Sequence, residues 1–237
     1  MFFEIIIVSV ITLLIGTITF AKLNRKSSKE KSKERNTKLL AYIVITTLLY
    51  VSIAFVPILL YIITAFLIFV ALREILVAAE HAEKRPYIAL MVSGAILYAF
   101  AHFIKNTPPE TTLFTFFIVI HFDAFSQLVG ETLGSRKMIP KISPMKTWEG
   151  FWGGFVAALI AGFVIYKFNE PLKTLTQVTF IVAAALAGDL LASWYKRICG
   201  VKNYSTLIPG HGGVIDRFDS FFMAGALFQL LEWFYSH

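Results

Sequence analysis

Apolar residues fall in long runs along this chain, and short polar stretches separate the runs. A helix needs about 20 apolar residues to cross the hydrocarbon core of a bilayer. The pattern therefore predicts an all-α fold, a polytopic membrane helix bundle with about eight transmembrane helices. The predicted spans lie near residues 2–20, 39–55, 56–72, 87–104, 113–133, 150–167, 175–195 and 216–235.

The stretch 39–72 is the ambiguous part of this pattern, because it is long for one helix and short for two. Pro57 would break or kink a helix there. Basic residues favour two spans, since loops rich in Lys and Arg stay in the cytoplasm. With two spans, the following basic loops share one side: 22–38, 73–86, 134–147 and 196–213. We therefore expect eight spans with both termini outside.

The composition supports a membrane protein, because 57% of residues are hydrophobic and 16% are charged, whereas soluble domains carry about 25% charged residues. The net charge of +7 does not indicate nucleic acid, since eight of the 22 Lys and Arg lie in 22–38, directly after the first apolar run. Such a stretch sets topology and can contact anionic lipid headgroups, or is simply a solvated loop. Residues 2–20 lack a basic start and a cleavage site, so we expect a retained anchor helix.

Acidic residues near or within the apolar runs are the most informative polar positions. A carboxylate inside a bilayer is costly unless it is paired, solvated or bound to metal. The acids in question are Asp123, Glu131, Glu149, Asp189, Asp216 and Asp219. In the predicted topology each lies in the middle or at the cytoplasmic end of a span. We therefore expect one polar cavity that faces the cytoplasm.

Asp216 and Asp219 are three residues apart, so they share one face of a helix. Two carboxylates without a cysteine or a close histidine pair suit a hard cation such as Mg²⁺. Asp189, near the end of the preceding span, could add a third oxygen. The alternative is a charge network, in which Asp216 and Asp219 pair with Arg217, Lys196 or Arg197.

Two segments offer groups that bind phosphate. GHGG (210–213) would place backbone amides at the start of the last helix, where anions are favoured, although it could also be a plain turn. The segment 141–154 offers Ser143, Lys146 and Thr147 at another helix start, without the spacing of a P-loop. Its hydroxyls could instead cap that helix. His211 is the histidine retained as a candidate.

These segments resemble the signature of the phosphatidate cytidylyltransferases, also called CDP-diacylglycerol synthases. That signature runs S-x-x-K-T-x-E-G, then G-D, then G-H-G-G-x-x-D-R-x-D. The chain carries SPMKTWEG (143–150), GD (188–189) and GHGGVIDRFD (210–219) in that order. The resemblance covers roughly residues 120–237. We expect N-terminal transmembrane helices over 1–112, with the basic cytoplasmic loop 22–38, and a catalytic transmembrane domain over 113–237.

The resemblance implies Mg²⁺-dependent transfer of CMP from CTP to phosphatidate or a related lipid phosphate. The products would be CDP-diacylglycerol and pyrophosphate, made at the cytoplasmic face of the cell membrane by a homodimer. The implied metal ligands are Asp189, Asp216 and Asp219, which with Lys146 form the catalytic set. The implied substrate contacts are Ser143, Lys146, Thr147, His211, Arg217 and Asp123. Whether a second cation such as K⁺ shares the site stays open.

One segment departs from the family pattern. The family shows D-T-G-A-Y followed by G-R, whereas this chain reads DAFSQ from Asp123, and Glu131 follows Gly130. An enzyme acting on another lipid phosphate therefore stays open. A CTP-dependent kinase of a lipid alcohol, with Asp123 or Asp189 as base, would release CDP instead of pyrophosphate. A cation-coupled transporter would use the same two acids as midplane ion sites, but the polar residues gather at one face.

Overall fold

The computed structural model describes the backbone of residues 2–24, 29–83, 86–167, 169–208 and 212–236. Over these residues the chain forms eight α-helices and one two-stranded antiparallel hairpin. The helices are α1 (Phe2–Asn24), α2 (Lys29–Phe55), α3 (Pro57–Glu80), α4 (Tyr87–Asn106), α5 (Pro109–Leu133), α6 (Trp148–Tyr166), α7 (Pro171–Ile198) and α8 (Ile215–Ser236). The strands are β1 (Lys137–Ile139) and β2 (Ser143–Thr147). The prediction of a mostly helical membrane fold is confirmed, and the hairpin is an addition to it. The predicted basic loop 22–38 is wrong in part, because residues 29–38 form the first turns of α2.

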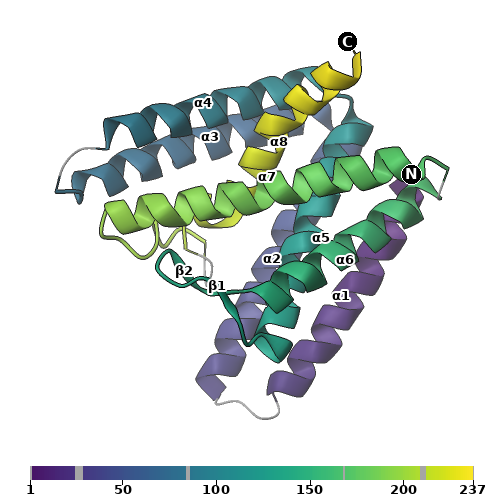
Figure 1. Cartoon of the computed structure of the whole chain (residues 1–237), viewed down its shortest axis with the longest axis horizontal. Helices are drawn as coiled ribbons and strands as arrows, with labels where there is room; N and C mark the ends of the chain where they lie inside the picture. Colours follow the sequence, from purple (N-terminus) through teal and green to yellow (C-terminus); the bar gives the residue numbers. More distant parts are fainter. Residues whose placement is uncertain (1, 25–28, 84–85, 168, 209–211, 237) are drawn as a thin grey trace.

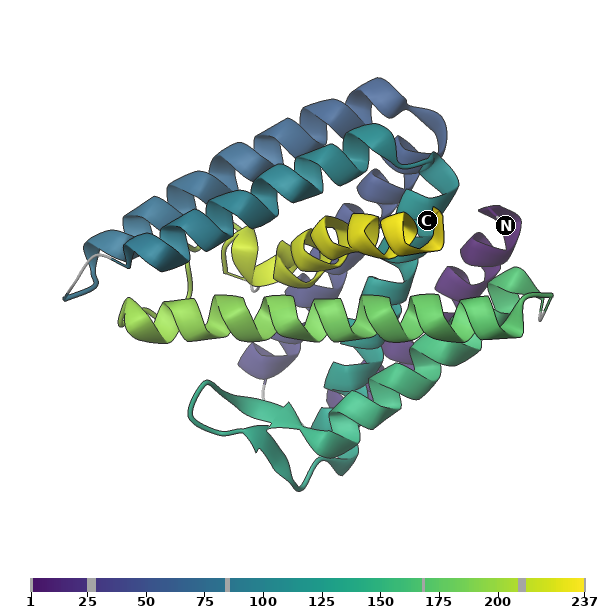
Figure 2. The same cartoon turned by 45° about the horizontal axis from the view of Figure 1, so that its top comes forward.

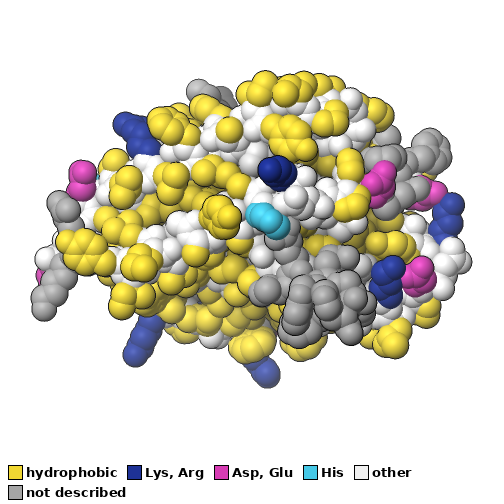
Figure 3. All heavy atoms as spheres, turned by 90° about the horizontal axis from the view of Figure 1, so that it is seen from above, with side chains coloured by type: hydrophobic (Ala, Val, Ile, Leu, Met, Phe, Trp, Pro, Cys, Tyr) yellow, Lys and Arg dark blue, Asp and Glu magenta, His cyan; other side chains and the backbone are white. Residues whose placement is uncertain are grey.

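Five helices in the described part of the chain, α3 to α7, are long and apolar enough to cross a membrane. Shorter apolar stretches, Ile7–Ile18 and Leu39–Phe55, lie in α1 and α2. Large apolar side chains are exposed on the outer helices, as Phe69 (68%) and Met91 (75%) show. Figure 3 shows apolar side chains over most of one face of the molecule. Such a surface is unfavourable in water and suits contact with lipid.

The boundary between α2 and α3 answers the question raised by 39–72. α2 ends at Phe55, and α3 begins at Pro57. Proline has no backbone N–H, and its fixed φ fits the first position of a helix. Pro57 therefore starts a helix instead of kinking one, and the predicted division into two helices is confirmed.

Two helix pairs carry the segments singled out by sequence. α6 packs most closely against α5, and α7 packs against α8, which also lies against α4. Figures 1 and 2 show α7 crossing the molecule with the hairpin beside its C-terminal half. Gly188 brings α7 against α8, because a Cβ at this position would lie 2.5 Å from the backbone oxygen of Asp219. Asp189 is thereby held beside α8.

The hairpin and the N-terminus lie at opposite ends of α6. Lys167, just after α6, forms an ion pair of 2.8 Å with Glu4 near the start of α1, and Figure 1 shows the N-terminus beside this connection. The hairpin directly precedes α6, a helix of 19 residues and therefore about 28 Å long. The segment 143–150 thus lies at the end of α6 away from Lys167.

An aromatic core fixes the position of α8. Phe100 of α4 packs edge-on against Phe221 and Phe222, with ring centroids 5.0 Å apart in both pairs. Phe116 of α5 also packs against Phe221, with ring centroids 5.1 Å apart. All four rings are buried. The Phe-rich stretch of α5 therefore belongs to the core, and these ring contacts join α4, α5 and α8.

Candidate active site

Three carboxylates from three different helices meet at the polar end of the bundle. They are Asp123 of α5, Asp189 of α7 and Asp219 of α8, called here the acid cluster, and all three are half-buried. The charge of Asp219 interacts with those of both Asp189 and Asp123. Lys146 of β2 forms an ion pair with Asp189, and its charge also acts on Asp123 and Asp219.

The acid cluster carries more negative charge than its lysine balances. Serine hydroxyls supply weak additional contacts, since Ser193 donates to Asp189 at 3.3 Å and Ser220 donates to Asp123 at 3.5 Å. Like charges held in a partly dehydrated site repel one another strongly. The cluster is therefore suited to attract a cation. Among the described residues, however, no three Asp, Glu, His or Cys side chains group closely enough to hold a metal ion by themselves.

Arg217 adds a second cation near the cluster. Its guanidinium lies over the ring of Tyr42 from α2, 5.0 Å from the ring centroid, and its charge acts on Asp123. Stacking on an aromatic ring leaves the edge of the planar guanidinium for oxygen acceptors. Arg217 and Lys146 together therefore bring positive charge to Asp123 from two different elements.

Asp216 has different partners from Asp219, although the two share a helical turn. Its Oδ1 accepts from the Lys196 ammonium at 2.6 Å. Its Oδ2 accepts from the backbone N–H groups of Tyr204 and Gly213, both at 2.9 Å. The Asp216 side chain is only 6% exposed. For Asp216, the structure matches the predicted alternative of a charge network, and its role as a metal ligand stays a prediction.

The 143–150 segment divides between the hairpin and the start of α6. Ser143 opens β2 opposite Ile139. The buried hydroxyl of Thr147 accepts from the N–H of Gly150 at 3.1 Å, which makes Thr147 the N-cap of α6. The predicted capping alternative is confirmed for Thr147. Its contact with phosphate, and that of Ser143, stay predictions.

Two further candidates from the sequence, Glu131 and His211, are not part of the acid cluster as the structure describes it. Glu131, near the end of α5, is exposed and accepts from the side chain of Gln127 at 2.8 Å. His211 lies outside the described residues, as do Pro209 and Gly210. The predicted role of His211 in binding phosphate therefore stays a prediction.

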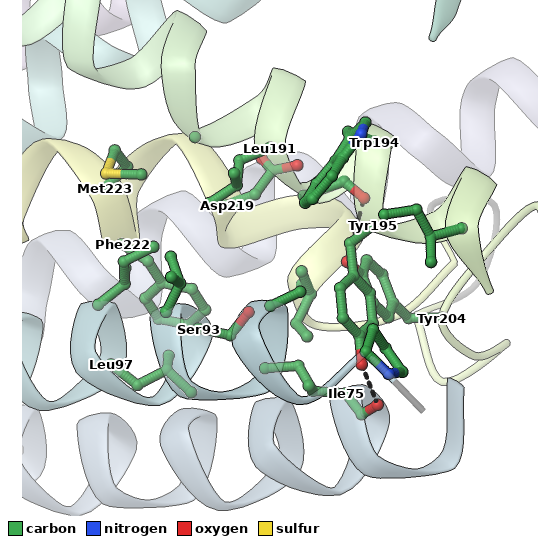
Figure 4. A pocket seen from close by; sticks show the side chains of 18 of the residues that line it. Ile75, Ser93, Leu97, Leu191, Trp194, Tyr195, Tyr204, Asp219, Phe222 and Met223 are labelled. Atoms are coloured by element: carbon green, nitrogen blue, oxygen red, sulfur yellow. Dashed lines mark hydrogen bonds between the residues drawn. The ribbon is translucent and has the colours of Figure 1, made fainter. Parts of the chain in front are cut away.

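A cavity of about 640 Å³ lies between α4, α7 and α8, and one of its walls includes Asp219 (Figure 4). Most of its lining is apolar, with Leu97, Trp194 and Phe222 among the contributors. Its size falls within the range of small-molecule sites, about 300–1,000 Å³. The apolar sequence of α4 indicates a membrane helix. It does not predict the cavity, because the cavity forms between helices that are distant in sequence.

Two tyrosines line one end of the cavity with their hydroxyls satisfied. Tyr195 donates to the carbonyl of Ile75 at 3.0 Å, and Tyr204 donates to the carbonyl of Ala192 at 3.1 Å. Burial, followed by the charges of Asp219 and Asp216, raises the pKa of the Tyr204 phenol. Tyr204 therefore remains a neutral donor, and it holds the loop after α7 against that helix.

One buried carboxylate, Glu74 of α3, is not among the predicted site residues. It is 4% exposed and contacts the start of α8. Its oxygens accept from the backbone N–H groups of Val214 and Ile215, each at 3.0 Å. The sequence does show Glu74 as an acidic residue inside the apolar run FVALREILVAAE. That run lies in the half of the chain without signature motifs.

Comparisons with known proteins agree on one family. The model of a family described as "Cytidylyltransferase family" matches residues 1–235. A phosphatidate cytidylyltransferase from Haemophilus influenzae is 42% identical over 130 residues, which cover 52% of this chain and 45% of that protein. Those from Staphylococcus saprophyticus and Staphylococcus aureus are 41% and 42% identical over 123 residues, covering 50% of this chain and 47% of each relative. The chain therefore spans about half the length of the curated relatives it matches.

Proposed function

This chain belongs to the cytidylyltransferase family, and from that premise we propose that it transfers CMP from CTP to phosphatidate, forming CDP-diacylglycerol and pyrophosphate. One structural observation supports this proposal independently of family membership. Asp219 belongs both to the acid cluster and to the wall of the apolar cavity. A site for phosphates and a site for acyl chains would thus adjoin, as a reaction between a nucleotide and a lipid requires.

The cavity supports a lipid as the acceptor. Its lining is largely apolar, and α4 and α7, which form two of its walls, are long and apolar enough to cross a membrane. Burying apolar surface there is favourable for an acyl chain. An acyl chain in the cavity would keep its phosphate near Asp219, within reach of Lys146 and Arg217.

Magnesium is the cofactor we infer for this site. Mg²⁺ is usually held by one or two carboxylates together with substrate phosphates and water, so it does not need three protein ligands. Asp189 and Asp219 offer such carboxylates, and the excess negative charge of the acid cluster supports a divalent cation. Asp216 would first have to release Lys196 and two backbone amides. When bound, Mg²⁺ would neutralise part of the charge on the substrate phosphates.

The residues around the cluster would act by positioning and charge. An oxygen of the lipid phosphate attacks the α-phosphorus of CTP, and the bond to the β-phosphate oxygen breaks as pyrophosphate leaves. The lipid phosphate is already ionised at neutral pH, so no strong general base is needed. Lys146 would turn from Asp189 to a phosphate oxygen, and Arg217 would hold a second phosphate. Catalysis then rests on alignment and charge neutralisation.

We also propose an integral membrane enzyme with eight spans, both termini outside and the active site facing the cytoplasm. The five apolar helices support a membrane protein, and the basic residues after the first apolar run support a cytoplasmic position for that segment. A homodimer is part of the same proposal and is taken from the family resemblance. Chemical crosslinking in native membranes would test whether the protein forms a homodimer.

Pyrophosphate release tests the reaction. Purified protein in detergent would receive CTP, Mg²⁺ and phosphatidate, and a control would omit the lipid. We expect lipid-dependent pyrophosphate together with a CDP-lipid product. Lipid-dependent CDP would show a kinase, and cation flux in liposomes without nucleotide turnover would show a transporter. Either result would overturn the proposal.

A further inference from the structure

Glu74 is a carboxylate in a buried position, where a charge is unfavourable without partners. It is almost fully buried in α3, a helix with apolar residues on both sides of it. A charge at such a depth is costly unless it is paired or hydrogen-bonded. Its partners come from sequence positions about 130 to 140 residues later. The contact therefore joins the N-terminal half of the chain to the signature half.

The partners of Glu74 are Ser205, in the loop after α7, and Val214 and Ile215 where α8 begins. The Oε1 atom accepts from Val214 N–H at 3.0 Å and from the Ser205 hydroxyl at 2.6 Å. The Oε2 atom accepts from Ile215 N–H at 3.0 Å. The first N–H groups of a helix have no partners within that helix, and the helix dipole favours an anion beside them. Glu74 supplies that anion from a neighbouring helix.

Two glycines make room for carboxylates at this point. A Cβ on Gly213 would lie 2.5 Å from Glu74 Oε1. A Cβ on Gly212 would lie 2.7 Å from Asp216 Oδ2, and its φ of 87° is one that residues other than glycine rarely adopt. These glycines, which the sequence pattern associated with phosphate, are packed here against two acids of the chain itself.

Glu74 and Asp216 hold the start of α8 from two sides. Asp216 accepts from Tyr204 N–H and Gly213 N–H, while Glu74 accepts from the next two amides and from Ser205. Asp219 lies one helical turn beyond this anchor. A shift at the start of α8 therefore moves Asp219 relative to Asp123 and Asp189, which stand on other helices.

We propose that Glu74 is a positioning residue for the reaction: it clamps the start of α8 and thereby sets Asp219 within the acid cluster. Both of its oxygens accept from donors of the chain itself, so it would act through α8. The inference rests on the proposed function for its kinetic consequence only. The clamp itself is a property of the fold and can be measured without turnover.

The test compares Glu74→Gln with Glu80→Gln, a matched control at the exposed end of the same helix. Glutamine keeps the shape of Glu74 but turns one acceptor into a donor that faces another donor. We expect the backbone amides of Val214 and Ile215 to exchange hydrogen about tenfold faster in Glu74→Gln, because a buried hydrogen bond to a charged group is lost. Exchange in α5 should not change.

Kinetics then separate positioning from a purely structural role. In folded Glu74→Gln, kcat for pyrophosphate release should fall about tenfold or more, while KM for CTP stays within about threefold, because alignment and not binding is impaired. Ser205→Ala removes one of the three hydrogen bonds and should shift exchange and kcat in the same direction by less. It keeps the test usable if Glu74→Gln folds poorly.

Two results would overturn the inference. Unchanged exchange at Val214 and Ile215 would show that Glu74 does not hold α8, and faster exchange with wild-type kcat would show a structural contact without catalytic consequence. Absence of pyrophosphate release by the wild-type protein would instead refute the proposed function, and the exchange comparison would still decide whether the clamp exists.

Discussion

Replacing Asp216 with asparagine removes one charged acceptor from a site where both carboxylate oxygens are engaged. Lys196 donates to one oxygen at 2.6 Å, and two backbone amides donate to the other. Asparagine can offer its oxygen to only one of these groups, and its NH₂ then faces the other. The Lys196 and Asp216 side chains are 14% and 6% exposed, so water can do little to compensate.

The expected loss of stability in Asp216→Asn follows from this burial. Removing one partner of a buried ion pair costs about 3–5 kcal/mol, and asparagine retains one hydrogen bond, so we take the lower end. In a chain of this size 1 kcal/mol corresponds to about 2–4 °C in Tm. Asp216→Asn should therefore lower Tm by roughly 6–12 °C. Asp219→Asn should leave Tm unchanged or raise it, because it removes one of three mutually repelling carboxylates, and it should abolish turnover.

Thermal unfolding in detergent, followed by circular dichroism, measures both variants. EDTA in all samples ensures that a lost metal ion does not contribute to the difference. The double variant Asp216→Asn/Lys196→Met should be more stable than Asp216→Asn alone, because no unpaired ammonium remains buried.

The reasoning would be refuted if Asp216→Asn melted within about 2 °C of the wild type while Asp219→Asn lost much more. The two aspartates would then have the opposite roles. Near-normal turnover in Asp219→Asn would separately refute its assignment to the metal site.

Three further substitutions test other parts of the site. Lys146→Ala should lower kcat about 100-fold or more in the pyrophosphate assay, as loss of a transition-state donor does, whereas Lys141→Ala on the exposed hairpin turn should not. Thr147→Val should lower Tm by about 2–4 °C through loss of the α6 cap, and Thr147→Ser should not. Ser93→Trp should fill the cavity and raise KM for long-chain more than short-chain phosphatidate, whereas Tyr98→Trp on the exposed face of α4 should leave both unchanged.

Each of these expectations has a contrary result. Equal losses in Lys146→Ala and Lys141→Ala would mean that hairpin stability, not the ammonium, matters. An unchanged Tm in Thr147→Val would mean that the cap is replaced by other contacts. Equal effects of Ser93→Trp on short and long chains would mean that acyl chains do not enter the cavity.

The helices could be predicted because each is coded locally. Runs of about 20 apolar residues mark spans, and Pro57 marks a boundary because its ring forbids a helix interior but fits a helix start. The hairpin was missed because Lys137–Ile139 and Ser143–Thr147 are too short for a clear alternation of apolar and polar residues. The strands pair next to α6 and α7, and the local sequence does not show these contacts.

The site could be predicted only as a set of residue types. Depth along each span placed six acids in one cavity, and the structure brings three of them together, Asp123, Asp189 and Asp219. Glu131, Glu149 and Asp216 have other partners. Spacing put Asp216 and Asp219 on one face, but it cannot tell which carboxylate meets Lys196. Glu74 was missed because its partners lie about 130 to 140 residues away, and no local pattern records such a contact.

The shared position of Asp219, between acid cluster and cavity, has a thermodynamic consequence. An acyl chain entering the cavity would displace water from one side of this carboxylate, and a less hydrated carboxylate gains more from a nearby cation. Lipid and divalent cation should then bind cooperatively. Linkage makes the effect reciprocal: whatever factor the lipid contributes to cation affinity, the cation returns to the affinity for lipid. Each ligand would thus favour binding of the other.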